Sequence, residues 1–259
     1  MEKLILFDFD GVIIDGMDEY WQSSLIACEK YLKSPEIEKG FDINREVSDT
    51  FIAIRPWVKY GWEMVLITHE ICKKDEPLNN PKRENFIKNY KHNCQAILNR
   101  NSWNPYILQR SLDNARNYQI KLDKNAWLKL HRPFGEIKNF IQRLQINGIK
   151  IGIITTKGKI FATEILHQLK IYPELIFGYE DGKKVDIISR LIKEFEIQGF
   201  IEDRKETLMK LITKKKLKSI PYYLASWGYV KANDLLDIPQ EINVLKLKDL
   251  KDLKNILAY

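Results

Sequence analysis

Residues 7–15 read Phe-Asp-Phe-Asp-Gly-Val-Ile-Ile-Asp (FDFDGVIID), a stretch that places two acids close together in an apolar setting. The apolar run of residues 4–7 before the acids is typical of a short buried strand. Asp8 and Asp10 stand at the end of that run, although carboxylates are costly to bury and are normally solvated or paired. Alternate residues of a strand point the same way, so both side chains can face one site. The pair therefore indicates a cation, a reaction or both.

Gly11, directly after the pair, lets the backbone turn sharply and approach a ligand closely. Carboxylate and carbonyl oxygens, completed by water and phosphate oxygens, suit a hard cation such as Mg²⁺. Paired acids also suit a nucleophile with a general acid beside it. Taken alone, the stretch is equally compatible with a turn in which Asp8 and Asp10 only cap backbone groups.

The composition is that of an ordinary globular chain, with 259 residues, of which 44% are hydrophobic and 30% charged. The apolar run before Asp8 is too short for a signal-peptide core, and no apolar stretch approaches the length of a membrane span. Three scattered cysteines without a CxxC spacing fit a reducing compartment and support neither a zinc site nor a disulfide framework. We expect a cytoplasmic protein with no membrane partner.

The net charge is +7, but the lysines are spread along the whole chain. The one dense run, KKKLK at residues 214–218, lies near a predicted helix end, where the helix dipole favours cations. Basic runs alone are weak evidence, so a solvated face is favoured over a nucleic-acid patch. The charge can still help to attract an anionic substrate.

From about residue 137 onward, apolar strand patterns alternate with helical ones. The strands are expected at residues 149–154, 175–177, 199–201 and 222–225, and the helices at 137–144, 160–169, 185–195 and 208–212. This alternation predicts an α/β fold: a Rossmann-like parallel sheet core with helices on both faces. Ligands of such sheets bind beyond the carboxyl ends of the strands, which is where Asp8 and Asp10 lie.

Residues 16–132 have a different pattern. Apolar residues recur at helical spacing over 17–32, 47–72, 84–99 and 105–118, and strand alternation is not convincing anywhere in the segment. The segment is therefore predicted to be an inserted α-helical domain of residues 16–132. The α/β core domain is then made of residues 1–15 and 133–259.

Three later strand ends also carry polar side chains. In chain order these are Thr155 and Thr156, Lys183 and Lys184, and Glu202 and Asp203. A hydroxyl with free backbone amides makes an anion cradle, and lysine binds phosphate as a point charge. Each feature has an ordinary structural alternative: a helix cap, solvent exposure, or pairing of acids with a helix dipole. Their common position at the carboxyl ends of strands in one sheet favours a shared site.

The stretches DFDGV, IITT, GKK before a helix, and IEDR closely resemble the four motifs of the haloacid dehalogenase-like (HAD) superfamily of phosphohydrolases. The order of the motifs and the insertion after the first resemble a member with a helical cap domain of the C1 type. The resemblance covers residues 1–15 and 133–245, whereas the insertion matches only in position and helical character.

The resemblance implies a role for each matching residue. Asp8 is expected to be the nucleophile that forms an aspartyl-phosphate, and Asp10 the acid that protonates the leaving oxygen and later activates water. Thr155 is expected to hold a phosphoryl oxygen, and Lys184 to neutralise developing charge. Asp203 is expected to complete a Mg²⁺ site with Asp8 and the backbone carbonyl of Asp10.

Several positions depart from the family pattern or stay open. Lys183 is an alternative to Lys184, because the usual proline after the lysine is missing. Thr156 replaces a frequent asparagine and is expected, with Gly11, to contact the substrate. Glu202 is expected beside the metal ligands, and Glu206 is a weaker ligand candidate.

Two further segments carry candidate binding residues. In IRPWVKYGWEM (residues 54–64), Arg55 can reach a second anionic group of the substrate, although ordinary packing of an amphipathic helix is favoured. In SWGYV (residues 226–230), which follows the last predicted strand, lining of the cleft and packing are equally plausible.

These predictions favour a Mg²⁺-dependent phosphatase acting on a small phosphorylated metabolite. A phosphomutase similar to β-phosphoglucomutase is the alternative on the same scaffold. A non-catalytic basic binding protein is the least favoured. Asp10 argues against dehalogenation, because the dehalogenating branch of the family lacks this second acid. That branch has no alkoxide leaving group for the acid to protonate. The identity of the substrate and the oligomeric state are not indicated.

Overall fold

The computed structural model describes residues 1–37, 40, 42 and 45–252. It divides into two compact units, which we call the α/β unit (Met1–Asp15 with Arg132–Tyr259) and the helical unit (Gly16–His131). That the units are domains with the predicted limits, 1–15 with 133–259 and 16–132, stays a prediction.

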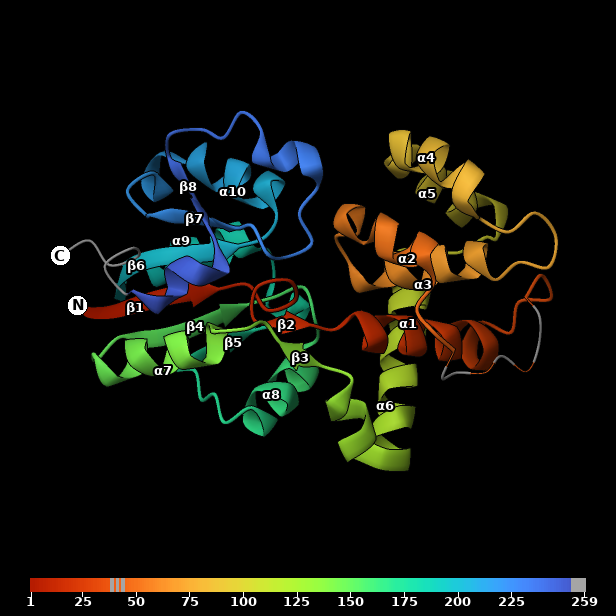
Figure 1. The fold of residues 1–259 in the computed structure, drawn as a ribbon, viewed down its shortest axis with the longest axis horizontal. Coiled ribbons are helices and arrows are strands. Elements are labelled where there is room, and N and C mark those ends of the chain that lie inside the picture. Colours follow the sequence, from red (N-terminus) through yellow and green to blue (C-terminus); the bar gives the residue numbers. More distant parts are fainter. Residues whose placement is uncertain (38–39, 41, 43–44, 253–259) are drawn as a thin grey trace. The chain divides into compact units, whose positions relative to one another are not determined.

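The α/β unit is built on a sheet of six parallel strands in the order β5-β4-β1-β6-β7-β8. The strands are β1 (Glu2–Phe7), β4 (Lys150–Ile154), β5 (Leu175–Phe177), β6 (Phe195–Glu202), β7 (Tyr222–Ala225) and β8 (Ile242–Leu245). β1 lies in the interior between β4 and β6 (Figure 1), so residues that follow β1 have structure on both sides. The predicted α/β, Rossmann-like fold class is confirmed.

Helices cover both faces of this sheet. They are α7 (Ile137–Ile146), α8 (Lys159–Gln168), α9 (Lys184–Leu191) and α10 (Lys205–Ile212). Leu4 and Leu6 of β1 pack into one core cluster with apolar residues of α9 and α10. On the opposite face the ring of Phe7 meets that of Phe140 in α7, with centroids 6.2 Å apart. This alternation along β1 is the two-residue period of a strand buried on both faces.

One helix prediction was wrong in its end, and one strand was not predicted. The helix expected over 185–195 ends at Leu191, and Phe195 instead begins β6, where it pairs with Glu2 of β1. Phe195 fits the helical spacing, but pairing with the start of β1 extends β6 backwards, while β7 pairs with β6 only from Phe200 onward. β8 was not predicted, because its central residues Asn243 and Val244 are exposed at the sheet edge and give no buried apolar run.

A second sheet joins the two places where the chain passes between the units. β2 (Ile14–Asp15) and β3 (Arg132–Pro133) pair in antiparallel fashion, with Asp15 opposite Arg132. Strands of two residues leave no periodic signal, so the sequence did not predict them.

The helical unit contains six α-helices in its described part. They are α1 (Met17–Ile26), α2 (Asp49–Ile54), α3 (Gly61–Ile71), α4 (Asn80–Lys88), α5 (Tyr90–Arg100) and α6 (Pro105–Lys129), and a π-helical segment (Ala27–Leu32) continues α1. The predicted helix over 47–72 is divided by a 3-10 turn at Arg55–Trp57, which contains Pro56. α6 begins where the Asn104 side chain accepts a hydrogen bond from the amide of Ile107 at 2.9 Å, a typical helix cap.

Short 3-10 turns complete the α/β unit. They cover Tyr179–Asp181, Lys215–Leu217, Ala232–Leu235 and Leu247–Lys251.

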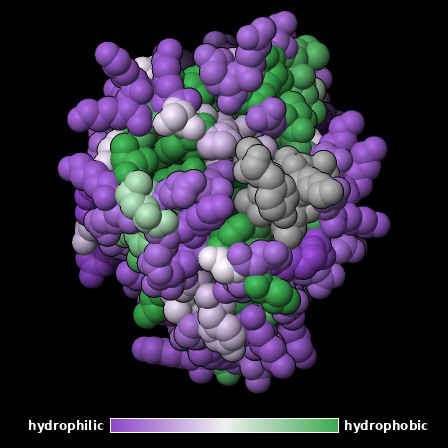
Figure 2. All heavy atoms as spheres, turned by 90° about the vertical axis from the view of Figure 1, so that its left-hand side faces the viewer, coloured by the Kyte–Doolittle hydropathy of each residue, from purple (hydrophilic) through white to green (hydrophobic). Residues whose placement is uncertain are grey.

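Figure 2 shows mainly hydrophilic side chains among the coloured atoms on the face at the left of Figure 1, with hydrophobic ones in separate patches. Across the described residues, none of the helices combines the length and apolar character needed to span a membrane.

Candidate active site

The loop after β1 places the first two acids. The amide of Asp8 donates to the carbonyl oxygen of Ile201 at 2.8 Å, which continues the pairing of β1 with β6 by one residue. Gly11 then takes a φ of +88°, a left-handed conformation that favours glycine. A Cβ on Gly11 would lie 2.0 Å from Oδ2 of Asp203. Any residue other than glycine is therefore disfavoured at this position for two reasons: the left-handed backbone conformation and the steric clash with the carboxylate of Asp203.

Asp8 lies at the centre of the candidate site. Its side chain is buried, and Oδ1 accepts a hydrogen bond from the amide of Phe9 at 2.7 Å. Nζ of Lys184 lies 2.8 Å from the same oxygen. Burial and then the charge of Glu202 raise the pKa of Asp8 from 3.8 to about 7, and Lys184 opposes this shift. The ionised form of Asp8 therefore depends on nearby positive charge to stabilise it.

Lys184 bridges two acids, because its Nζ is also 2.9 Å from Oε2 of Glu202. Burial disfavours its charge, but the adjacent carboxylates outweigh burial and raise its pKa. Burial also raises the pKa of Glu202, which Lys184 opposes. Lys183, the alternative from the sequence, is exposed and stands just before α9. Of the two lysines, Lys184 is the one that contacts Asp8.

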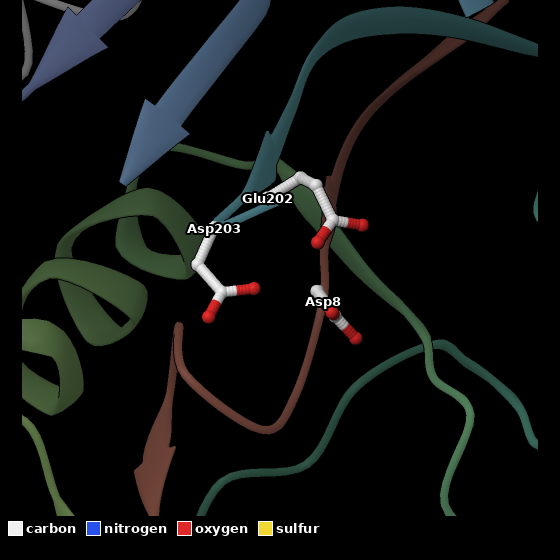
Figure 3. Close-up of side chains that lie close together, drawn as sticks. All are labelled: Asp8, Glu202 and Asp203. Carbon is white, nitrogen blue, oxygen red and sulfur yellow. The ribbon is translucent and has the colours of Figure 1, made fainter. Parts of the chain in front are cut away.

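Three carboxylates meet at the ends of β1 and β6 (Figure 3). One oxygen from each of Asp8, Glu202 and Asp203 lies within 4.8 Å of the others. Glu202 is already engaged, since Oε2 contacts Lys184 and Oε1 accepts the amide of Arg204 at 3.1 Å. The hard oxygen donors, and the glycine that brings the loop backbone against Asp203, fit a divalent cation such as Mg²⁺.

The end of β4 differs from the sequence expectation of free amides. Thr155 is buried, and its amide donates to the carbonyl oxygen of Phe177 at 2.9 Å. The amide of Lys157 donates to Oγ1 of Thr155 at 3.0 Å, and that of Lys159 to Oε1 of Glu180 at 3.2 Å. The prediction of free amides here is wrong for these three residues, because loop closure and a carboxylate at the start of α8 engage them. The Thr155 hydroxyl can still donate a proton to an anion.

Lys157 is a site residue that the sequence reasoning missed. Its side chain is 1% exposed, and its Nζ lies 3.6 Å from Oδ1 of Asp10. The signal was present, since this lysine directly follows the threonine pair in IITTKGK. Asp8 and Asp10 thus each have a lysine beside them, the half-buried Lys184 and the buried Lys157.

The remaining candidates lie elsewhere or play other parts. Thr156 is half-buried beside Thr155 at the end of β4. Glu206 lies on the surface, where it pairs with Lys210 at 2.7 Å, so it is not part of the acid cluster. Arg55 belongs to the helical unit, where its guanidinium lies 5.0 Å from the centre of the Tyr20 ring. The α/β unit therefore brings together Asp8, Lys184, Gly11 and Asp203, with Asp10 in the same loop after β1. Thr155 and Thr156 follow β4, the strand that pairs with β1.

The sequence model of one protein family, described as haloacid dehalogenase-like hydrolase, matches residues 2–209. No curated protein matches the sequence. Many solved structures resemble the fold. One is a predicted phosphatase from Clostridium acetobutylicum, with 15% identity, a TM-score of 0.58 and coverage of 96% of each chain.

Two other structures carry more specific descriptions. A predicted phosphoglycolate phosphatase from Haemophilus somnus 129pt has 13% identity and a TM-score of 0.57, covering 98% of this chain and 97% of that chain. A candidate beta-phosphoglucomutase from Thermotoga maritima has 15% identity and a TM-score of 0.53, covering 98% of this chain and 100% of that chain. At such low identities the likeness shows the shared fold alone.

Proposed function

Because the chain belongs to the haloacid dehalogenase-like hydrolase family, we propose that it is a Mg²⁺-dependent phosphatase of a small phosphorylated metabolite. The observation that carries the proposal is the buried Asp8 carboxylate, which contacts Lys184 at 2.8 Å. Burial withdraws this carboxylate from water, while the lysine supplies positive charge beside it. A structural ion pair needs no second acid at Asp10 and no third at Asp203.

In the proposed reaction Oδ of Asp8 attacks the phosphorus of the substrate. The bond between phosphorus and the ester oxygen breaks, and Asp10 gives its proton to that oxygen. A water molecule then attacks the phosphorus of the aspartyl-phosphate and loses a proton to Asp10. The bond to Asp8 breaks, which restores the carboxylate and releases inorganic phosphate.

Positioning and charge stabilisation supply most of the catalysis in phosphoryl transfer. Lys184 balances charge at Asp8, and the hydroxyl of Thr155 donates to a phosphoryl oxygen. Asp8, Asp203 and the backbone carbonyl of Asp10 would hold Mg²⁺, which when bound offsets the negative charge of the phosphoryl oxygens. Lys157 holds the carboxylate of Asp10 in place from the β4 side.

The test is release of inorganic phosphate from a panel of phosphorylated metabolites, with Mg²⁺ and with a chelator. Phosphoglycolate and glucose phosphates belong in the panel, because structures of this fold bear those descriptions. We expect release that requires Mg²⁺. Isomerised sugar phosphate without net release would instead indicate a phosphomutase. Absence of both reactions from the whole panel would contradict the proposal.

A further inference from the structure

The sequence SWGYV left open whether residues 226–230 line a site or only pack. In the structure this segment follows β7 and lies against the two elements that carry the acids. We call its central part, Trp227–Tyr229, the clamp segment. Its contacts fall into two groups, one to Asp203 after β6 and one to the loop after β1.

The first group fixes the carboxylate of Asp203. The amide of Tyr229 donates to Oδ2 of Asp203 at 2.8 Å. Gly228 lies so close that a Cβ there would be 2.5 Å from Cβ of Asp203 and 2.2 Å from the carbonyl oxygen of Gly11. Because Asp203 is itself only 2% exposed, its orientation is set by these protein groups rather than by water.

The second group fixes the loop after β1. The indole Nε1 of Trp227 donates to the carbonyl oxygen of Val12 at 3.1 Å. The hydroxyl of Tyr229 donates to Oδ1 of Asp15 at 2.7 Å. Asp15 is the last residue of β2, so the hydroxyl ties the clamp segment to the point where the chain leaves the α/β unit.

Tyr229 therefore holds one acid by its backbone and another by its side chain. A hydrogen bond from a neutral hydroxyl to a carboxylate is charge-assisted and stronger than a neutral one. It restrains the turn that carries the amide aimed at Asp203. Without it, the turn would keep its packing but lose the restraint that aims the amide.

We propose that Tyr229 is a positioning residue for a divalent cation at Asp203, and that its hydroxyl acts through Asp15. The inference rests on the proposed function in one respect, namely that Asp203 binds Mg²⁺. It adds a residue outside the motifs that the sequence resemblance matched.

The experiment compares Mg²⁺ affinity, measured by titration calorimetry without substrate, in the natural chain and in Tyr229→Phe. Loss of the hydroxyl should weaken Mg²⁺ binding by roughly threefold to tenfold, the range for one ordinary hydrogen bond, because the hydroxyl acts on Asp203 only through the turn. Tyr222→Phe is the matched control, because this hydroxyl, at the other end of β7, donates to the carbonyl oxygen of Leu217 at 2.9 Å. That variant should lose stability without losing Mg²⁺ affinity.

A double variant separates action through Asp15 from general loosening. Asp15→Ala should weaken Mg²⁺ binding by a similar factor, and Asp15→Ala with Tyr229→Phe should be no weaker than the singles. With a substrate in hand, Tyr229→Phe should raise the Mg²⁺ concentration needed for half-maximal rate and leave kcat at saturating Mg²⁺ nearly unchanged. A merely structural role of Tyr229 would not raise the required Mg²⁺ concentration while leaving kcat unchanged.

Equal Mg²⁺ affinity in the natural chain and Tyr229→Phe would overturn this inference and leave the proposed function standing. Additive losses in the double variant would overturn it as well. Failure of the natural chain itself to bind Mg²⁺ would overturn both this inference and the metal requirement of the proposed function. The titration of the natural chain thus distinguishes the two failures.

Discussion

Both units of the molecule bury charged side chains, but they balance the charge differently. In the helical unit, Arg116 donates to both oxygens of Glu19, at 2.8 and 3.2 Å, and Ser23 donates to one of them at 2.6 Å. Glu19 is the one fully buried acid that this guanidinium contacts among the described residues, because Asp113, 3.6 Å from Nη1 of Arg116, has a side chain that is 20% exposed to water. In the α/β unit, Asp8 and Glu202 share the single ammonium of Lys184, and Asp203 lies close by.

This difference separates a structural ion pair from a candidate site. A balanced pair neutralises itself and needs no ligand, whereas buried acids in excess over cations are electrostatically unfavourable until a cation joins them. Burial is the largest cause of the raised pKa values of Asp8 and Glu202, and a neighbouring acid, Glu202 for Asp8 and Asp203 for Glu202, raises each further. Burial of charged side chains occurs in both units, so burial alone would not have identified which unit holds the candidate active site.

The largest effect is expected for Asp8→Asn, which keeps the shape of the side chain and removes the nucleophile. Turnover should fall by about 10⁴-fold or more, as is usual when a covalent nucleophile is lost. Phosphate release with Mg²⁺ measures it. The matched control is Glu19→Gln, a buried acid of the helical unit that should retain chemistry in the folded fraction. Activity of Asp8→Asn within tenfold of the natural chain would show that the acids of the α/β unit are no more catalytic than the buried pair of the helical unit.

The balanced pair should show its importance in stability instead. Arg116→Met leaves Glu19 buried without its guanidinium partner and should lower the free energy of unfolding by about 3–5 kcal/mol. Denaturant unfolding followed by circular dichroism measures the loss. Adding Glu19→Gln to Arg116→Met should restore part of it, because the stranded charge is then removed. A loss below about 1 kcal/mol would show that the pair is not the buried, balanced one described.

The shared cation is tested by Lys184→Met. Loss of one positive charge at a phosphoryl-transfer site should lower kcat/KM by about 10²–10³-fold. Lys183→Met is the adjacent control on an exposed side chain, and its kcat/KM should stay within about threefold. Equal losses in the two variants would contradict the assignment of Lys184.

The excess of acid also predicts how stability depends on pH in the metal-free protein. The pKa of Asp8 is about 7 in the folded chain against an ordinary 3.8, so between these values the folded state holds a proton that the unfolded state has lost. Stability therefore decreases as pH rises from about 4 to 7. Asp8→Asn should be more stable than the natural chain at pH 8, by about 1–4 kcal/mol, and similar to it below pH 4. Thermal unfolding with a chelator at both pH values measures this, and a less stable Asp8→Asn at pH 8 would contradict it.

The sequence was sufficient where local pattern and chemistry coincide. Asp8, Thr155, Lys184 and Asp203 each follow an apolar strand, and parallel strands bring such residues to one edge. Their common position could be predicted because the order of these residues and their place after each strand can both be recognised from short stretches of sequence.

The rest depended on contacts between distant segments. The tie from Tyr229 to Asp15 joins residues 214 positions apart, and nothing in either local sequence predicts it. Lys157 was visible as a lysine but not as a buried partner of Asp10. β8 was not predicted because the exposed residues of an edge strand interrupt the apolar pattern. The pair of Glu19 with Arg116 was not predicted because it forms only when two helices that are far apart in the sequence pack together.

The most direct test of the central claim is to find where phosphate becomes attached during turnover. The protein is mixed with Mg²⁺ and a small phosphorylated substrate that it hydrolyses, quenched in acid within milliseconds, digested and mapped by mass spectrometry. We expect a labile phosphoryl group on the peptide that contains Asp8, and none on that peptide in Asp8→Asn. Phosphate release without any phosphorylated peptide, or with the group on another residue, would contradict it.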